Sequence, residues 1–142
     1  APTPQGSHAY SAQPAAGAIE AIVAALQAHP QEARVQQFGC CTLGNVCLGT
    51  DAAGLARIQR AADAGAIEAV VAALQAHSQV AGVQEQGCRA LGNVCYGDDA
   101  AGGARKQRAA DAGAIQAVVA ALQAHPQEED VQEQGCAALG NV

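Results

Sequence analysis

The sequence repeats itself at a fixed interval of 48 residues. The string AGAIEAIVAALQAHP at 16–30 returns with few changes at 64–78 and 112–126, and residues 61–94 match residues 109–142 at 28 of 34 positions. Such a period is typical of repeat proteins, whose units cannot bury their apolar faces alone and stack on their neighbours. Near-identity of this degree indicates recent duplication or design.

The period inside one unit is helical. Ile67, Val70, Val71 and Leu74 follow the spacing i, i+3, i+4, i+7, which predicts an amphipathic helix over 66–76. Helix ends are indicated by residues that recur at the unit boundaries: Gly17, Gly65 and Gly113 as left-handed caps, His29, His77 and His125 in the last turns, and Pro30 and Pro126 as stops. We therefore interpret the histidines as helix ends and not as metal ligands.

A second helix is expected over about 82–96. Gly87 and Gly92 lower its helix propensity, so we expect close contact with neighbouring helices there. A loop and a short helix should occupy 97–113. The apolar stripe of the second helix consists of Val83, Gly87, Cys88, Leu91, Val94 and Cys95.

The short helix differs between its two copies. Leu55 and Ile58 provide an apolar face in the earlier copy, whereas Gly103 and Lys106 replace them in the later one. We expect the later short helix to be docked more weakly.

Stacked three-helix units predict an all-α protein, a right-handed α-solenoid of about three 48-residue repeats. The repeats are 16–63, 64–111 and an incomplete one at 112–142, preceded by a Pro/Ser/Gln-rich lead over 1–15 that should be disordered or extended. The apolar end of the last unit favours a longer array, or an end that another molecule covers.

Composition excludes several classes of function. The net charge is −6 and the only basic cluster is ARKQR at 104–108, which argues against nucleic-acid binding. No apolar run approaches the roughly 20 residues that span a bilayer. With one Phe, two Tyr and no Trp, an aromatic-walled pocket is not expected.

The six cysteines do not form a metal or disulfide pattern. Cys40, Cys88 and Cys136 are 48 residues apart, and Cys47 and Cys95 follow the first two by seven residues, or two helical turns. This spacing fits neither zinc hairpins nor an intrahelical disulfide. We expect free thiols that act as small core residues, no metal or other cofactor, and an intracellular, reducing compartment such as the cytoplasm or nucleus.

The strings GAIEAVVAAL and VQEQGCRALGNV, in units of three helices, resemble the armadillo repeat family over residues 16–142. In that family the third helices of successive repeats line a concave groove, where an Asn side chain hydrogen-bonds the main chain of a bound peptide. The resemblance assigns this role to Asn45, Asn93 and Asn141. A carboxamide carries both donor and acceptor and can match both polar groups of a peptide unit.

Importin-α type members carry a Trp four residues before that Asn. Here these positions are Cys41, Arg89 and Ala137, so the stacking walls for basic side chains are absent. One turn earlier lie Gln37, Glu85 and Glu133, which would make the groove a mixture of amides, one Arg, one Cys and two Glu.

Other uses of the polar rows are open at this point. The three Asn side chains could instead cap local carbonyls. We interpret two glutamine rows as solvated helix faces, Gln36, Gln84, Gln132 and Gln27, Gln75, Gln123. The Asp-Ala-Gly strings at 63–65 and 111–113 suggest turn chemistry.

The leading hypothesis is a non-enzymatic protein-interaction scaffold that holds an extended or helical partner segment along the third helices. The alternative is a structural subunit or fragment of a large assembly, contacting neighbours through solenoid edges and ends. An idealised protein without a natural ligand is a third possibility, which the free cysteines fit poorly. No set of residues indicates an enzyme, apart from a conceivable thiol site at Cys40–Cys41 near Arg89.

Overall fold

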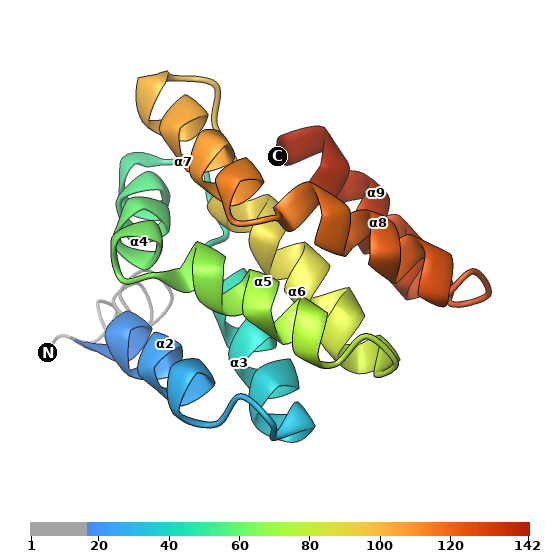
Figure 1. Ribbon diagram of the computed structural model, residues 1–142. Helices are drawn as coiled ribbons and strands as arrows, with labels where there is room; N and C mark the ends of the chain where they lie inside the picture. The colour runs from blue at the N-terminus through green and yellow to red at the C-terminus, as the bar shows by residue number, and fades with distance from the viewer. Residues whose placement is uncertain (1–16) are drawn as a thin grey trace, which may run out of the picture.

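The computed structural model describes residues 17–142, which form an all-α structure with no strand among them (Figure 1). The lead predicted over 1–15 lies outside the described residues. The helices are α2 (Ala18–Ala28), α3 (Ala33–Val46), α4 (Ala52–Asp63), α5 (Ala66–Ala76), α6 (Ala81–Val94), α7 (Ala100–Asp111), α8 (Ala114–Ala124) and α9 (Glu129–Asn141).

Equivalent helices of the three sequence units lie next to one another in chain order. α6 packs against α3 on one side and α9 on the other, and α5 contacts α2 and α8 in the same way. Each of the pairs α2/α3, α5/α6 and α8/α9 is itself packed together, while α4 and α7 lie along one edge (Figure 1). The apolar faces are therefore buried between successive pairs.

The helices predicted from the apolar spacing are confirmed. α5 spans the predicted residues 66–76, and α6 covers 81–94 of the predicted 82–96, with Cys95 as its C-cap. All six residues of the predicted stripe are buried. α7 lies within the predicted segment 97–113.

Glycines at two positions of the unit have the predicted roles. Gly65 has a φ of 94°, in the left-handed region, and turns the chain from α4 into α5. A Cβ on Gly87 would lie 2.6 Å from Leu74 Cδ2, so the absence of a side chain lets α6 approach α5 closely.

The interpretation of Gln36, Gln84 and Gln132 as solvated was wrong. Gln84 is only 1% exposed, and its Nε2 donates to the carbonyl oxygens of Leu74 at 3.0 Å and His77 at 2.9 Å. These carbonyls end α5 and have no partner within that helix. Gln36 and Gln132 make the same pair of bonds at the ends of α2 and α8. The second row, Gln27, Gln75 and Gln123, is exposed as predicted.

The histidines are helix C-caps, as expected, and two of them also link units. His77 Nε2 lies 2.8 Å from the carbonyl oxygen of Pro30, and His125 Nε2 lies 2.8 Å from that of Ser78. Because a carbonyl oxygen only accepts, each Nε2 carries the hydrogen in this contact.

Arginine side chains tie both α4 and α7 to the preceding helix, and the expected apolar face of α4 is only partly present. Ile58 is buried, but Leu55 is exposed. In α7, Arg105 is only 5% exposed, and it donates from Nε to Val94 O at 2.9 Å and from Nη2 to Tyr96 O at 2.8 Å. Arg57 in α4 donates to Val46 O and Leu48 O.

Replacing Arg105 by Met should release α7. Few apolar side chains of α7 are buried. The hydrogen bonds from Arg105 to the end of α6 therefore contribute much of the energy that holds α7 in place. Hydrogen bonds to charged groups contribute about 1.5–3 kcal/mol, so amide exchange of α7 should speed up by roughly 30-fold. Hydrogen exchange followed by mass spectrometry measures this. Arg108→Met, which removes only an exposed ion pair with Glu68, is the control, and equal exchange in both variants would contradict the assignment.

Candidate partner-binding face

The nine residues predicted to contact a partner lie on three adjacent helices. On each helix they are four residues apart, which places them on one stripe, and α3, α6 and α9 lie side by side. None of the nine is buried, and Asn45, Glu133 and Ala137 are exposed. We call this surface the third-helix face: Gln37, Cys41 and Asn45 on α3, Glu85, Arg89 and Asn93 on α6, and Glu133, Ala137 and Asn141 on α9.

The asparagines connect the helices of this face. Asn93 Nδ2 donates to Gly44 O at 2.9 Å, and Asn141 Nδ2 donates to Gly92 O at 3.1 Å. Each amino group therefore bonds a carbonyl of the preceding unit and does not cap its own helix. The Oδ1 acceptors of Asn93 and Asn141 have no hydrogen-bond partner within residues 17–142.

Arg89 joins α6 to α3. Its Nη2 donates to Asn45 Oδ1 at 2.7 Å, and its Nη1 lies 3.4 Å from the carbonyl oxygen of Cys41. The predicted proximity of Arg89 and Cys41 is confirmed, but the hydrogen bond is to the backbone and not to the thiol. Two hydrogen bonds to α3 thus fix the position of the Arg89 side chain between the two helices.

The part of the face between α6 and α9 is acidic. Partial burial and the charge of Asp130 raise the pKa of Glu85 above its ordinary range, against the opposing effect of Arg89. Asp130 belongs to the same surface, yet sequence reasoning missed it. Asp130 stands at the repeat position of Gly82, which carries no side chain, and only the packing of α9 on α6 brings it to Glu85.

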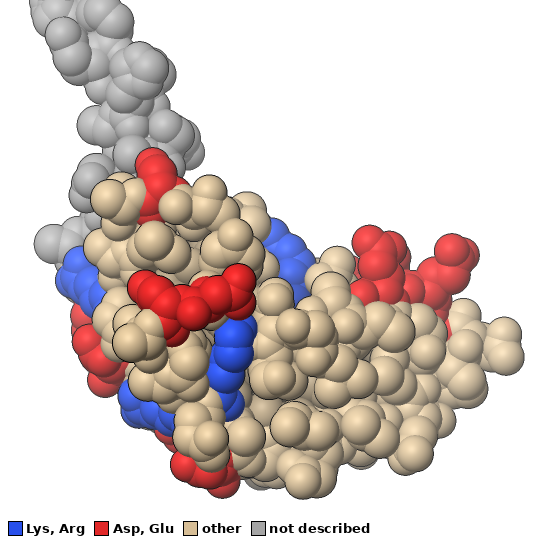
Figure 2. All heavy atoms as spheres, turned by 90° about the horizontal axis from the view of Figure 1, so that it is seen from above, with Lys and Arg blue, Asp and Glu red and all other residues tan. Residues whose placement is uncertain are grey.

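The basic cluster at 104–108 is used inside the chain. Lys106 Nζ donates to Cys95 O at 2.7 Å and Asn141 O at 3.0 Å, and Arg108 pairs with Glu68 at 2.6 Å. Arg105 is the buried residue that docks α7. Figure 2 shows acidic and basic groups interleaved on the left of the view, a separate acidic group at the upper right and a broad area without charged residues below it.

The cysteines are free, and four of them are core residues as predicted. Burial raises the pKa of Cys40 and Cys88 to about 12 and that of Cys47 and Cys95 to about 11. A thiolate nucleophile at Cys40 is therefore strongly disfavoured near neutral pH. Cys136 is exposed, which corrects the prediction for that residue. Within the described residues, no group of His, Cys, Asp and Glu could hold a metal ion.

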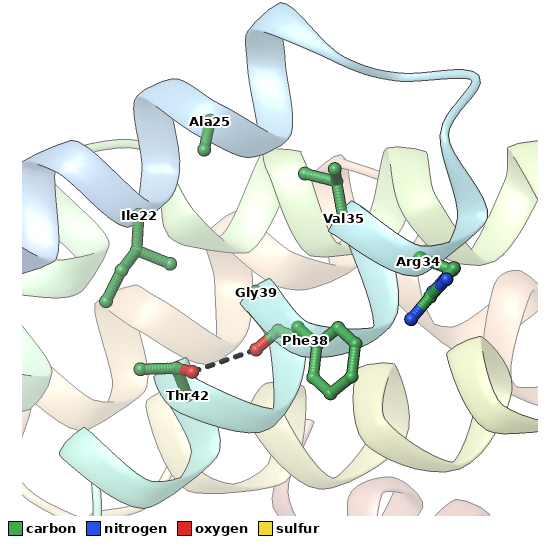
Figure 3. A pocket seen from close by; sticks show the side chains of 7 residues that line it. All are labelled: Ile22, Ala25, Arg34, Val35, Phe38, Gly39 and Thr42. Carbon is green, nitrogen blue, oxygen red and sulfur yellow. Dashed lines mark hydrogen bonds between the residues drawn. The ribbon is translucent and has the colours of Figure 1, made fainter.

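An open apolar groove lies between α2 and α3 (Figure 3). It has a volume of about 460 Å³, and Phe38 beside it is 62% exposed. Sequence reasoning did not find this groove, because Ile22 and Val35 stand at the repeat positions of the buried Val70 and Val83, and the pattern alone does not show which copy is covered. Its lining consists of Ile22, Ala25, Arg34, Val35, Phe38, Gly39 and Thr42.

Among residues 17–142, no helix combines the length and hydrophobicity needed to cross a bilayer. Comparison of the chain with protein-family models, curated proteins and solved structures finds no significant match.

Proposed function

We propose that the protein is a right-handed α-solenoid of armadillo type and acts as a non-enzymatic scaffold for other proteins. Its ligand would be an extended or helical segment lying along the third-helix face. The observation that carries this proposal is the alignment of three accessible, largely polar stripes on α3, α6 and α9. Such a strip suits a repeat protein, because small equivalent contacts add along it.

The asparagine bonds define how the face would hold a partner. Because Nδ2 of Asn93 and of Asn141 is fixed on a carbonyl, each Oδ1 has a set direction. The face therefore presents preorganised acceptors for partner N–H groups, and preorganisation lowers the entropic cost of binding. Glu85, Asp130 and Glu133 favour a partner segment with a basic side chain near α9.

A matched pair of alanine substitutions tests this proposal. Ala137 is exposed on the third-helix face, and Ala120 is exposed on α8. We expect Ala137→Arg to weaken peptide binding at least about tenfold, because a long charged side chain would occupy the strip, and Ala120→Arg to change it less than about twofold.

Peptides for this test come from a displayed library of unstructured sequences selected on the unmodified chain. Their affinities for the three proteins are then measured by fluorescence anisotropy, after circular dichroism shows equal helix content. Equal affinities for the two variants would contradict binding at this face.

A second candidate function is a structural subunit of a large assembly that contacts its neighbours through the ends and edges of the array. The exposure of Phe38, Ile115 and Val119, all large and apolar, favours it. Four buried free thiols fit an intracellular, reducing compartment for either function.

A further inference from the structure

The two ends of the described helical array carry the two halves of one interface. We call the groove side of α2 and α3 the leading end, with Ile22, Arg34, Val35 and Phe38. The trailing end, on α8 and α9, carries Ile115, Val119, Glu133 and Cys136. The repeat counterparts of Ile22, Val35, Ile115, Val119 and Cys136 are buried wherever a neighbouring unit is present, whereas those of Arg34, Phe38 and Glu133 are partly buried or exposed.

Burial at the trailing end shows this directly. Ile115 is 40% exposed, whereas Ile67, at the same repeat position, is 0% exposed beneath the following unit. Val119 is 37% exposed and its counterpart Val71 is 2% exposed. The trailing end therefore has the side chains that elsewhere in the chain receive the next unit.

The leading end is the complementary half. Ile22 and Val35 are only partly buried beside the open groove. Their counterparts Val70 and Val83 are both 0% exposed, because the preceding unit covers them. The groove in Figure 3 is thus the surface on which a preceding unit would pack.

Charge at these ends is also complementary. Inside the chain, the same two repeat positions meet at each unit boundary. At the first boundary a Cβ on Gly82 would lie 2.5 Å from the Gln37 side chain. At the second, Asp130 lies near enough to Glu85 to raise the pKa of Glu85. Arg34 stands at the repeat position of Gly82 and Asp130, and Glu133 stands at that of Gln37 and Glu85. In a stacked pair of copies the same register would therefore place Arg34 of one copy beside Glu133 of the other. Within the chain this pairing is neutral or repulsive, and between copies it becomes attractive.

Unused hydrogen-bonding groups match in the same register. His77 bonds Pro30 O and Asn93 bonds Gly44 O across one unit boundary. Their counterparts at the leading end are His29 and Asn45 Nδ2, and the counterpart carbonyls at the trailing end are those of Pro126 and Gly140. None of these four groups has a cross-unit bond within the described residues.

We propose that the leading end of one copy of this chain docks on the trailing end of another, continuing the internal repeat interface head to tail. The occupant of each end is a second copy of the chain. The contact is heterologous and does not close, so it would generate linear oligomers. It joins the ends of the array and shares Asn45 and Glu133 with the third-helix face, so sedimentation and not peptide binding is its test.

Charge reversal tests this on the full, tag-free chain by sedimentation velocity over a range of concentrations. The unmodified chain should form species heavier than 14.1 kDa as concentration rises. Arg34→Glu alone and Glu133→Arg alone should each weaken association at least about tenfold, since like charges then meet. The double variant, and an equimolar mixture of the two single variants, should regain association.

Other outcomes would overturn the proposal. A chain that is folded by circular dichroism and still monomeric at about 200 μM would show that a second copy does not dock on its ends. If Val119→Glu abolishes association and Arg34→Glu leaves it unchanged, two trailing ends meet and the leading end is not part of the contact. If both single variants lose association and their mixture does not regain it, Arg34 and Glu133 do not face each other in the contact.

Discussion

Raising the pH from 8 to about 10.5 should strongly destabilise the protein. Burial raises the pKa of Cys40 and Cys88 to about 12 and of Cys47 and Cys95 to about 11, from an ordinary value of 9.0. Below pH 9 both the folded and the unfolded chain keep these protons, so the stabilisation is fully present. Above pH 9 the unfolded chain releases them and the folded chain does not, so stability falls as pH rises towards the folded-state values.

The expected loss is large compared with the stability of a domain. Four thiols that ionise only in the unfolded state lower the free energy of unfolding by up to about 5 kcal/mol per pH unit, or roughly 8 kcal/mol by pH 10.5. Total stabilities are about 5–15 kcal/mol. Urea titrations under reducing conditions at pH 8.5, 9.5 and 10.5 measure the slope.

A pair of cysteine variants separates the thiols from other alkaline titrations. Cys88→Ala should make the slope shallower by about 1.4 kcal/mol per pH unit, because one ionisation is removed. Cys136→Ala, at an exposed thiol, should leave it unchanged. If both variants keep the slope of the unmodified chain, the buried thiols do not cause the alkaline loss.

Replacing Gln84 by Leu should cost about 1–3 kcal/mol of stability. The change leaves the buried carbonyl of Leu74 without its Nε2 donor, whereas the carbonyl of His77 keeps the backbone N–H of Val80 at 3.0 Å. A buried group that loses its partner costs about 1–3 kcal/mol, and Leu restores the apolar volume but no hydrogen bond. Equilibrium unfolding in urea, followed by circular dichroism, gives the difference.

Gln75→Leu is the matched control, because Gln75 is an exposed glutamine on α5. Surface substitutions of this kind usually stay within about 0.5 kcal/mol. A similar loss of stability in both variants would mean that the hydrogen bonds from Gln84 to the end of α5 do not stabilise the protein.

The sequence predicted well those features that depend on local spacing. The helix over 66–76 was found with its boundaries because apolar periodicity and a left-handed glycine both point to them. Gln84 was misinterpreted because a polar residue on an apolar helix was taken to face water. Its partners lie on α5, and only the packing of α5 on α6 brings them within reach. Arg105 likewise appeared as one cation in a basic cluster, although its partners are carbonyls at the end of α6.

The candidate face was predictable in position but not in chemistry. The repeat and the resemblance to armadillo proteins placed Asn93 and Asn141 on accessible stripes of adjacent helices. Whether they face a ligand or the neighbouring helix was left open, since one sequence position serves both. The hydrogen bonds to the carbonyls of Gly44 and Gly92 occupy the Nδ2 donors of Asn93 and Asn141 and leave their Oδ1 acceptors for a ligand.

The central claim is that the third-helix face is where a partner segment binds. Amide chemical-shift mapping by NMR, with a peptide selected on the chain, tests this most directly. We predict that the largest shifts fall at 37–45, 85–93 and 133–141 on α3, α6 and α9. Largest shifts on α2 around Ile22 and Ala25 at one end, or around Ile115 and Val119 at the other, would contradict the claim and assign partner binding to the ends of the array.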